Sequence, residues 1–181
     1  ASIANSGVVF GPTLPTYYGG FDNKFRYKSI DLGLMFQFSG GNYLYNGTKA
    51  GLRDMRQWNN HTDMLNRWTP QNTSGTIPRV VFGDNVSNGS ALPITENLEK
   101  GDFIRLRSVI LGYNLPKSLM NTLKISNVRL YGQIQNAFVI TDYTGSDPEI
   151  SSNGDTNIAP GVDRNSVGQG RTYTFGLQVG F

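Results

Sequence analysis

The end of the chain alternates strictly between two kinds of side chain. Apolar residues occupy every second position, at Tyr173, Phe175, Leu177, Val179 and Phe181, and the residues between them are polar or small. Successive side chains of a β-strand point to opposite faces, so the pattern predicts a strand with one apolar face and one polar face. Phe181 is then the last residue of the apolar face.

Four earlier segments show a similar period of two, and with the last one they predict five strands at 21–28, 30–39, 102–115, 127–140 and 170–181. In the third strand, Ile104 and Leu106 are out of phase with Val109 and Leu111. One extra residue restores the phase of a strand, so we expect a β-bulge near Arg107 and Ser108.

The connections between these strands differ greatly in length. Residues 28–29 leave room only for a tight hairpin, and 116–126 is short, with space for a helical turn at 118–123. The segments 40–101 and 141–168 are long and polar. Alternating short turns and long loops are typical of outer-membrane barrels, in which the long loops are extracellular. The sequence therefore predicts an all-β fold, an antiparallel transmembrane β-barrel segment, with its C-terminus on the periplasmic side.

Composition excludes several other classes of protein. The chain has no cysteine, which rules out disulfides and zinc–thiolate sites, and its net charge of +3 is too small for a nucleic-acid footprint. No apolar run reaches the roughly 18 residues of a membrane helix. Residues 1–5 do not resemble a signal peptide, so we expect a mature, processed or excised chain.

The sequence offers little support for catalysis. His61 is the only histidine; it could bind a metal with Asp54 or Asp63, but a solvent-facing loop histidine is the favoured interpretation. A serine or cysteine triad has no support, and we expect no enzyme, no cofactor and no metal. Acidic residues in the second long loop could hold calcium or simply be solvated; they are Asp142, Asp147, Glu149, Asp155 and Asp163.

The first long loop supplies the candidate ligand-binding residues, Trp58, Trp68, Arg67 and Arg79. Aromatic faces beside planar hydrogen-bond donors suit a sugar or a partner surface, although the tryptophans could instead stabilise a folded loop. Three strand arginines could line the barrel lumen and pair with plug carboxylates, because a charge facing lipid is costly near the membrane centre, or they could sit near the membrane interface. They are Arg105, Arg107 and Arg129.

Several stretches, in order along the chain, resemble the late barrel of the SusC/RagA-type TonB-dependent outer-membrane transporters. They are Pro15 to Tyr27, Arg67-Trp68-Thr69-Pro70, Ile77-Pro78-Arg79, Asp102 to Pro116, Val128-Arg129-Leu130-Tyr131, Gln135-Asn136-Ala137-Phe138, Gly145-Ser146-Asp147-Pro148-Glu149 and Arg171 to Phe181. The chain departs from the family pattern at Ser146, where an aromatic is frequent, and at 168–170, where proline is frequent.

This resemblance implies a barrel of about 22 strands with a plug in its lumen. It also implies import of glycans or peptides, powered through TonB and assisted by a SusD-like surface lipoprotein. The chain contains neither a candidate plug nor a TonB box, so we expect a C-terminal part of the barrel, with the other strands, the plug and the TonB contact supplied from elsewhere. Phe175 and Phe181 resemble the assembly signal that barrel-insertion machinery reads, and loss of Phe181 should reduce insertion.

Two alternatives stay open at this point. The chain could be a self-contained outer-membrane barrel or adhesin of about eight strands. It could also be a secreted carbohydrate-binding β-sandwich, in which strands also alternate. The sequence does not identify a transported substrate.

Overall fold

The computed structural model describes residues 7–54, 59–79, 94–123, 125–152 and 158–180. The chain divides into two compact units. The loop unit comprises residues 1–16, 41–101 and 142–168, and the sheet unit comprises 17–40, 102–141 and 169–181. Among the described residues, no helix combines the length and the apolar character needed to cross a membrane.

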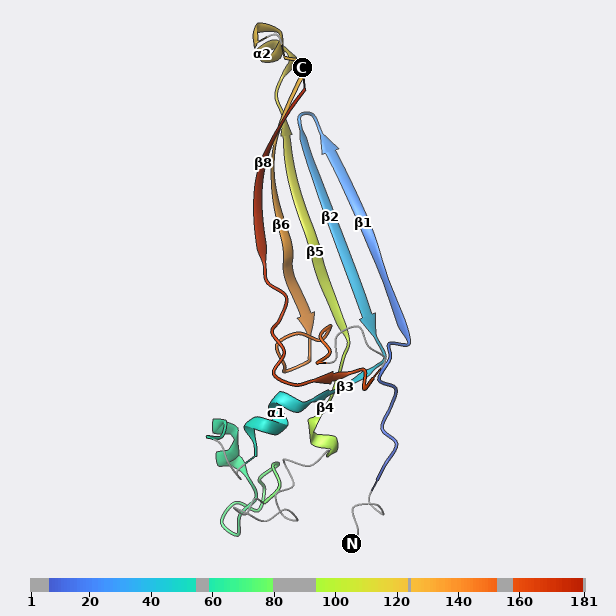
Figure 1. The fold of residues 1–181 in the computed structure, drawn as a ribbon, viewed down its shortest axis with the longest axis vertical. Coiled ribbons are helices and arrows are strands. Elements are labelled where there is room, and N and C mark those ends of the chain that lie inside the picture. The colour runs from blue at the N-terminus through green and yellow to red at the C-terminus, as the bar shows by residue number, and fades with distance from the viewer. Residues whose placement is uncertain (1–6, 55–58, 80–93, 124, 153–157, 181) are drawn as a thin grey trace. The chain divides into compact units, whose positions relative to one another are not determined.

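The sheet unit is one five-stranded sheet with the order β1-β2-β5-β6-β8, and every neighbouring pair is antiparallel (Figure 1). The strands are β1 (Tyr17–Tyr27), β2 (Ile30–Gly40), β5 (Phe103–Asn114), β6 (Asn127–Thr141) and β8 (Thr172–Gly180). The five predicted antiparallel strands are confirmed.

The first strand begins earlier than the sequence analysis expected. β1 starts at Tyr17 rather than at residue 21, because Tyr17 pairs with Gly40 and Gly20 pairs with Gln37. Glycines interrupt the apolar alternation here, so the pattern alone did not reveal the pairing. An aromatic ring replaces the missing side chain in one case, since a Cβ on Gly19 would overlap the ring of Phe38.

The short connections lie where they were expected. Lys28 and Ser29 join β1 to β2, and Lys28 has a φ of 53°, as the hairpin turns that match strand twist require. The connection between β5 and β6 contains the short helix α2 (Lys117–Leu123), which confirms the predicted helical turn.

Strand register gathers the apolar side chains on one face of the sheet. One row across all five strands consists of Phe25, Leu32, Leu111, Gly132 and Phe175. The ring of Phe175 lies over Gly132, and a Cβ added to this glycine would be 3.5 Å from the ring. Many large apolar residues on this face are exposed, and Phe175 itself is 85% exposed. The opposite, polar face carries mainly Gln, Thr, Ser, Asp and Arg.

The predicted bulge is confirmed at Arg107. Met35 pairs with Ser108 and Phe36 pairs with Leu106, which leaves Arg107 as the extra residue of β5. On β6, Asn136 and Ala137 lie opposite this bulge, because Ser108 pairs with Gln135 and Leu106 pairs with Phe138. Asn136 has a φ of 51°, a left-handed conformation that asparagine tolerates better than most residues.

An ion pair crosses β5 on the polar face. Arg129 on β6 donates from Nε to Oδ1 of Asp31 on β2 over 3.1 Å and makes a second bond through Nη2. Gly112 of β5 lies beneath this pair, and a Cβ there would come within 2.6 Å of Asp31 Oδ1. The absence of a side chain at Gly112 therefore lets the two charges meet.

The loop unit is built on a small sheet of order β4-β3-β7. β3 (Tyr43–Asn46) pairs antiparallel with β4 (Leu98–Lys100) and parallel with β7 (Val162–Asp163). The helix α1 (Gly47–Leu52) and the 3₁₀ helices η2 (Thr62–Asn66) and η4 (Thr95–Asn97) complete the unit. The two long connections thus form ordered structure together, although the sequence analysis treated them only as polar loops.

The segment that precedes β1 also belongs to this unit. The backbone N–H of Tyr43 donates to the carbonyl of Pro12 over 2.8 Å. The ring of Phe10 packs edge-on against Tyr43 with 4.7 Å between the ring centroids. Residues from three distant parts of the chain therefore fold together.

Replacement of Gly112 by alanine in the full-length protein should separate Asp31 from Arg129. We expect a loss of about 1 kcal/mol, the upper range for a partly exposed ion pair. The measurement is the temperature at which the protein loses its folded mobility on a gel. Gly33→Ala is the matched control, because its Cβ would meet only Ile110 Cβ at an ordinary 3.8 Å. Equal losses in both variants would contradict this explanation.

Candidate functional site

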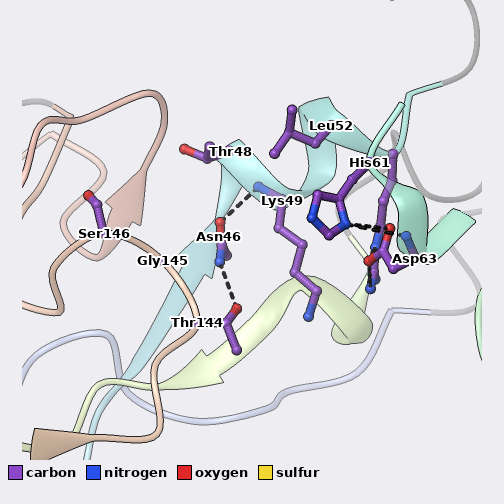
Figure 2. Close-up of a pocket in the computed structure, with 10 residues that line it drawn as sticks. Asn46, Thr48, Lys49, Leu52, His61, Asp63, Thr144, Gly145 and Ser146 are labelled. Atoms are coloured by element: carbon purple, nitrogen blue, oxygen red, sulfur yellow. Dashed lines mark hydrogen bonds and ion pairs between the residues drawn. The ribbon is translucent and has the colours of Figure 1, made fainter. Parts of the chain in front are cut away.

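The loop unit contains a pocket of about 400 Å³ (Figure 2). Three segments form its walls: α1 with the residues at its two ends, the start of η2, and residues 144–146. The lining residues are Asn46, Thr48, Lys49, Leu52, Arg53, His61, Asp63, Thr144, Gly145 and Ser146. Both long connections therefore contribute to one site.

Asn46 positions the first wall. Its side-chain oxygen accepts a hydrogen bond from the backbone N–H of Lys49 over 2.8 Å and so caps α1. Its amide nitrogen donates to Glu99 Oε1 over 3.2 Å and to Thr144 Oγ1 over 3.3 Å. Asn46 is only 2% exposed, so these bonds meet the needs of a buried amide and hold α1 against the 144–146 segment.

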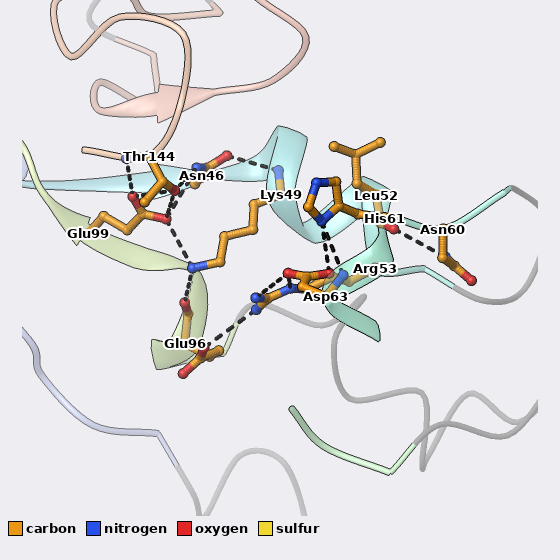
Figure 3. Close-up of polar contacts among 10 residues, drawn as sticks. All are labelled: Asn46, Lys49, Leu52, Arg53, Asn60, His61, Asp63, Glu96, Glu99 and Thr144. Carbon is orange, nitrogen blue, oxygen red and sulfur yellow. Dashed lines mark hydrogen bonds and ion pairs between the residues drawn. The ribbon is translucent and has the colours of Figure 1, made fainter. Parts of the chain in front are cut away.

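Glu99 on β4 joins the same two walls (Figure 3). Its carboxylate accepts hydrogen bonds from Thr144 N over 2.7 Å and from Thr144 Oγ1 over 2.8 Å, and Lys49 Nζ lies 3.1 Å away. Burial tends to raise the pKa of Glu99, but the hydrogen bonds from Thr144 and the charge of Lys49 outweigh it. The pKa of Glu99 is therefore below its usual value.

Arg53 anchors the start of η2 to α1. Its Nε and Nη2 donate to Asp63 Oδ2 over 2.8 and 2.6 Å, and its Nη1 donates to Glu96 Oε1 over 3.4 Å. The arginine side chain is 9% exposed, so these contacts compensate for its burial. Burial tends to raise the pKa of Asp63, but the bonds and charge of Arg53 are stronger and lower it overall.

His61 caps the 3₁₀ helix η2 and is not buried. Its Nδ1 lies 3.3 Å from the backbone nitrogen of Asp63 and 3.2 Å from Asp63 Oδ1. The side chain is 58% exposed and lines the pocket. This agrees with the favoured expectation of a solvent-facing loop histidine.

The described acidic residues of the second long loop do not form a metal-binding cluster. Asp163 is buried and accepts a hydrogen bond from Tyr143 Oη over 2.7 Å, and burial together with this carboxylate raises the pKa of Tyr143. Asp147 instead accepts from the backbone N–H of Glu149 over 3.0 Å. Asp155 lies outside the described residues. Within the part of the chain that the structure describes, no group of three or more His, Asp or Glu residues is arranged to hold a metal.

Three of the predicted ligand residues, Arg67, Trp68 and Arg79, are not among the residues that line the pocket. Trp58 lies outside the described residues. Trp68 donates its backbone N–H to the carbonyl of Ile77 over 2.8 Å, and Arg67 donates from Nη1 to the carbonyl of Met64 over 3.0 Å, so both belong to one turn. Arg79 follows this turn and is exposed. Contact of Arg67, Trp68 or Arg79 with a ligand stays a prediction.

The strand arginines have well-defined partners on the polar face. Arg107 donates to the side-chain oxygens of Gln37 over 2.6 Å, Asn136 over 3.2 Å and Gln169 over 2.6 Å. Arg105 is buried and its guanidinium lies 5.8 Å from the ring centroid of Phe103. Arg129 makes the ion pair across β5. The register thus places these residues on the face opposite the apolar one, as expected for residues that face a lumen.

Comparison with known proteins identifies the family, although no family model matches the chain. The TonB-dependent receptor P3 of Formosa agariphila is 35% identical over 185 residues, which cover 99% of this chain. The structure of the RagAB peptide importer in its closed-closed state matches 96% of this chain with a TM-score of 0.79 and 25% identity. This chain belongs to the SusC/RagA-type TonB-dependent receptors. SusC of Bacteroides thetaiotaomicron is 25% identical over 172 residues, or 90% of this chain.

The expected family and the expected β-barrel segment are therefore both confirmed. The chain spans 18% of the length of P3 and 15% of the length of SusC. It also covers 18% of the matched chain in the RagAB structure. Such a share corresponds to a segment of a TonB-dependent receptor.

The lowered pKa of Glu99 leads to a prediction about pH. Its contribution to stability is present above the ordinary glutamate pKa, about 4.3, and is lost as the pH falls through the lower folded value. We expect the protection factor of the Thr144 amide against hydrogen exchange to fall below about pH 4 in the full-length protein. Glu99→Gln should lower this factor already at pH 7 and weaken its pH dependence. The amide of Leu111 serves as the control, and unchanged protection of Thr144 in Glu99→Gln would refute the prediction.

Proposed function

We propose that this chain forms part of the wall of an outer-membrane TonB-dependent importer. The observation that carries the proposal is the apolar face that continues across all five strands of the sheet. Exposed apolar surface on this scale is unfavourable in water, whereas a barrel wall presents such a face to lipid. Strands β1 and β2 have 11 residues each, about 36 Å when extended, and a tilt near 45° matches an apolar band about 25 Å high.

The edges of the sheet support the proposal that further strands complete a barrel. β1 and β8 each have one strand partner in this sheet. An open strand edge is not tolerated in lipid, because unpaired backbone groups have no water to bind. We assign these strands to the C-terminal part of a barrel of about 22, with the remaining strands and the plug provided by the same transporter.

The orientation follows from the connections. Both long connections leave the sheet at the end opposite to the Lys28–Ser29 hairpin. In outer-membrane barrels the long loops are extracellular and the short turns are periplasmic. The end of β8 then lies on the periplasmic side, and the loop unit lies outside. Phe175 and Phe181 act in this proposal as the assembly signal for the barrel-insertion machinery, although Phe181 lies outside the described residues.

The proposed role is transport without catalysis. RagAB is described as a peptide importer, and the matched relatives are TonB-dependent receptors. By analogy, the complete protein imports glycans or peptides, works with a SusD-like surface lipoprotein, and receives energy through TonB. Membership of this family argues against both an independent adhesin barrel and a secreted sandwich.

The assignment of the two sheet faces can be tested with neighbouring residues of β8. The chain contains no native cysteine, so bimane can be attached to Leu177→Cys or Gln178→Cys in an otherwise cysteine-free full-length protein. After reconstitution, lipids with brominated acyl chains should quench bimane at residue 177 strongly, because its side chain faces lipid. Bimane at residue 178 should be quenched weakly.

Unbrominated lipid provides the control for differences in intrinsic brightness. Equal quenching at the two positions, or stronger quenching at residue 178, would exclude the proposed barrel wall. Uptake by cells that express the full transporter, with and without an active TonB system, then tests import itself.

A further inference from the structure

We infer that the pocket of the loop unit recognises an uncharged, hydroxyl-bearing segment of a ligand and discriminates against anionic groups. The inference rests on the proposed function, because a ligand reaches this pocket from the extracellular side only if the loop unit lies there. It goes further because it chooses one kind of ligand, uncharged and bearing hydroxyl groups, from the glycans and peptides proposed above. The carrying observation is that each charged residue of the lining is paired with an opposite charge, while the rest of the lining consists mainly of neutral hydrogen-bonding groups (Figures 2 and 3).

The charged lining residues form ion pairs within the described part of the loop unit. Lys49 lies 3.1 Å from Glu99, and Arg53 lies 2.6 Å from Asp63 and 3.4 Å from Glu96. Two cations therefore face three carboxylates, and these five groups together carry a net charge of −1. An anionic ligand would have to displace a carboxylate from a partly buried cation or approach a net negative charge. Both are unfavourable, so the pocket selects against carboxylate, sulfate and phosphate groups.

The neutral groups offer both donors and acceptors. Thr48 Oγ1 accepts a bond from the backbone N–H of Asn165 over 2.7 Å, so its own proton is free to be donated elsewhere. Ser146 Oγ donates to the carbonyl of Ser166 over 3.0 Å, so its lone pairs can accept a bond. The exposed imidazole of His61 adds a second ring nitrogen, Nε2, that can hydrogen-bond a ligand. Because a hydroxyl group can donate and accept at once, a hydroxyl-rich ligand matches this mixed set better than a ligand that only accepts.

The remaining lining suits a ring with one less polar face. Leu52 is partly exposed within the pocket, and the exposed imidazole of His61 gives a flat surface close to it. A volume of about 400 Å³ lies within the range of small-molecule sites. The pocket therefore has room for a short ligand segment, and a neutral sugar unit has the required combination of hydroxyl groups and C–H surface.

The test measures binding to the full-length transporter in detergent by isothermal titration calorimetry. The probes are a panel of neutral oligosaccharides, matched oligosaccharides that contain uronic acids, and a pentapeptide with both ends capped. We expect the tightest binding from a neutral oligosaccharide. Tightest binding by a uronate-containing probe or by the peptide would overturn the inference, and so would the absence of binding by every neutral oligosaccharide.

His61→Asn links this binding to the pocket. Asparagine is a good helix N-cap, so the variant keeps the start of η2 while it removes Nε2 and the ring. Binding of the neutral oligosaccharide should weaken about tenfold, as expected for one lost hydrogen bond and a lost ring contact. Thr76→Asn changes an exposed residue of the same unit outside the pocket and should bind normally.

Unchanged affinity in His61→Asn would overturn the assignment of binding to this pocket. The lipid-quenching experiment on β8 does not depend on the pocket. If the quenching pattern holds while the pocket variant has no effect, the inference about the ligand fails and the proposed function stands. If the expected quenching pattern is not observed, the proposed function is wrong, and the inference that rests on it is lost as well.

Discussion

Backbone hydrogen bonding in lipid is the constraint on which this account of the chain depends. A segment that crosses a bilayer must satisfy its backbone groups internally, and a strand does so only through its neighbours. The five strands form continuous antiparallel ladders, and their register decides which face meets lipid. A shift by a single residue would turn every apolar side chain of a strand to the polar face. The register of each strand therefore has to match its pattern of apolar and polar residues along the whole sheet.

The bulge at Arg107 shows how the chain meets this demand. In a regular strand, Leu106 and Leu111 would lie on opposite faces, because they are five residues apart. With the bulge, Leu106 pairs with Phe36 and Leu111 pairs with Leu32, and all four side chains share the apolar face. The bulge also turns the Arg107 guanidinium toward Gln37, Asn136 and Gln169, so a local irregularity gains three hydrogen bonds on the polar face.

The loop unit is stabilised by a different kind of interaction. The largest fully buried side chains in the described part of the protein are polar: Asn46, Asn97 and Asp163. Glu99 connects residues 50 positions before it and 45 positions after it in the sequence. Buried polar networks of this kind favour one arrangement, because partners left unpaired in a partly buried setting are costly. The same contacts shape the walls of the pocket.

Much of the sheet could be predicted because the residue pattern that specifies each strand or turn lies within that same short segment. The strands, the hairpin at Lys28, the bulge and the helical turn before β6 each follow from the spacing of nearby residues. β7 could not be predicted, since a strand of two residues has no period to recognise. The pocket was also missed. Asn46 has the residue type of a helix cap, but nothing in the spacing shows that Thr144 lies beside it, and the conspicuous Trp68 and Arg67 belong to a separate turn.

The central claim is that one face of the sheet meets lipid, and neighbouring residues of β6 test it most directly. Ile134 pairs with Tyr173 on the apolar face, and Gln133 pairs with Thr174 on the polar face. A lysine near the middle of a lipid-facing strand costs about 2–4 kcal/mol. The measurement is the amount of folded, heat-modifiable full-length protein in the outer membrane. The account predicts a strong loss for Ile134→Lys and near-normal amounts for Gln133→Lys; equal amounts, or the reverse order, would contradict it.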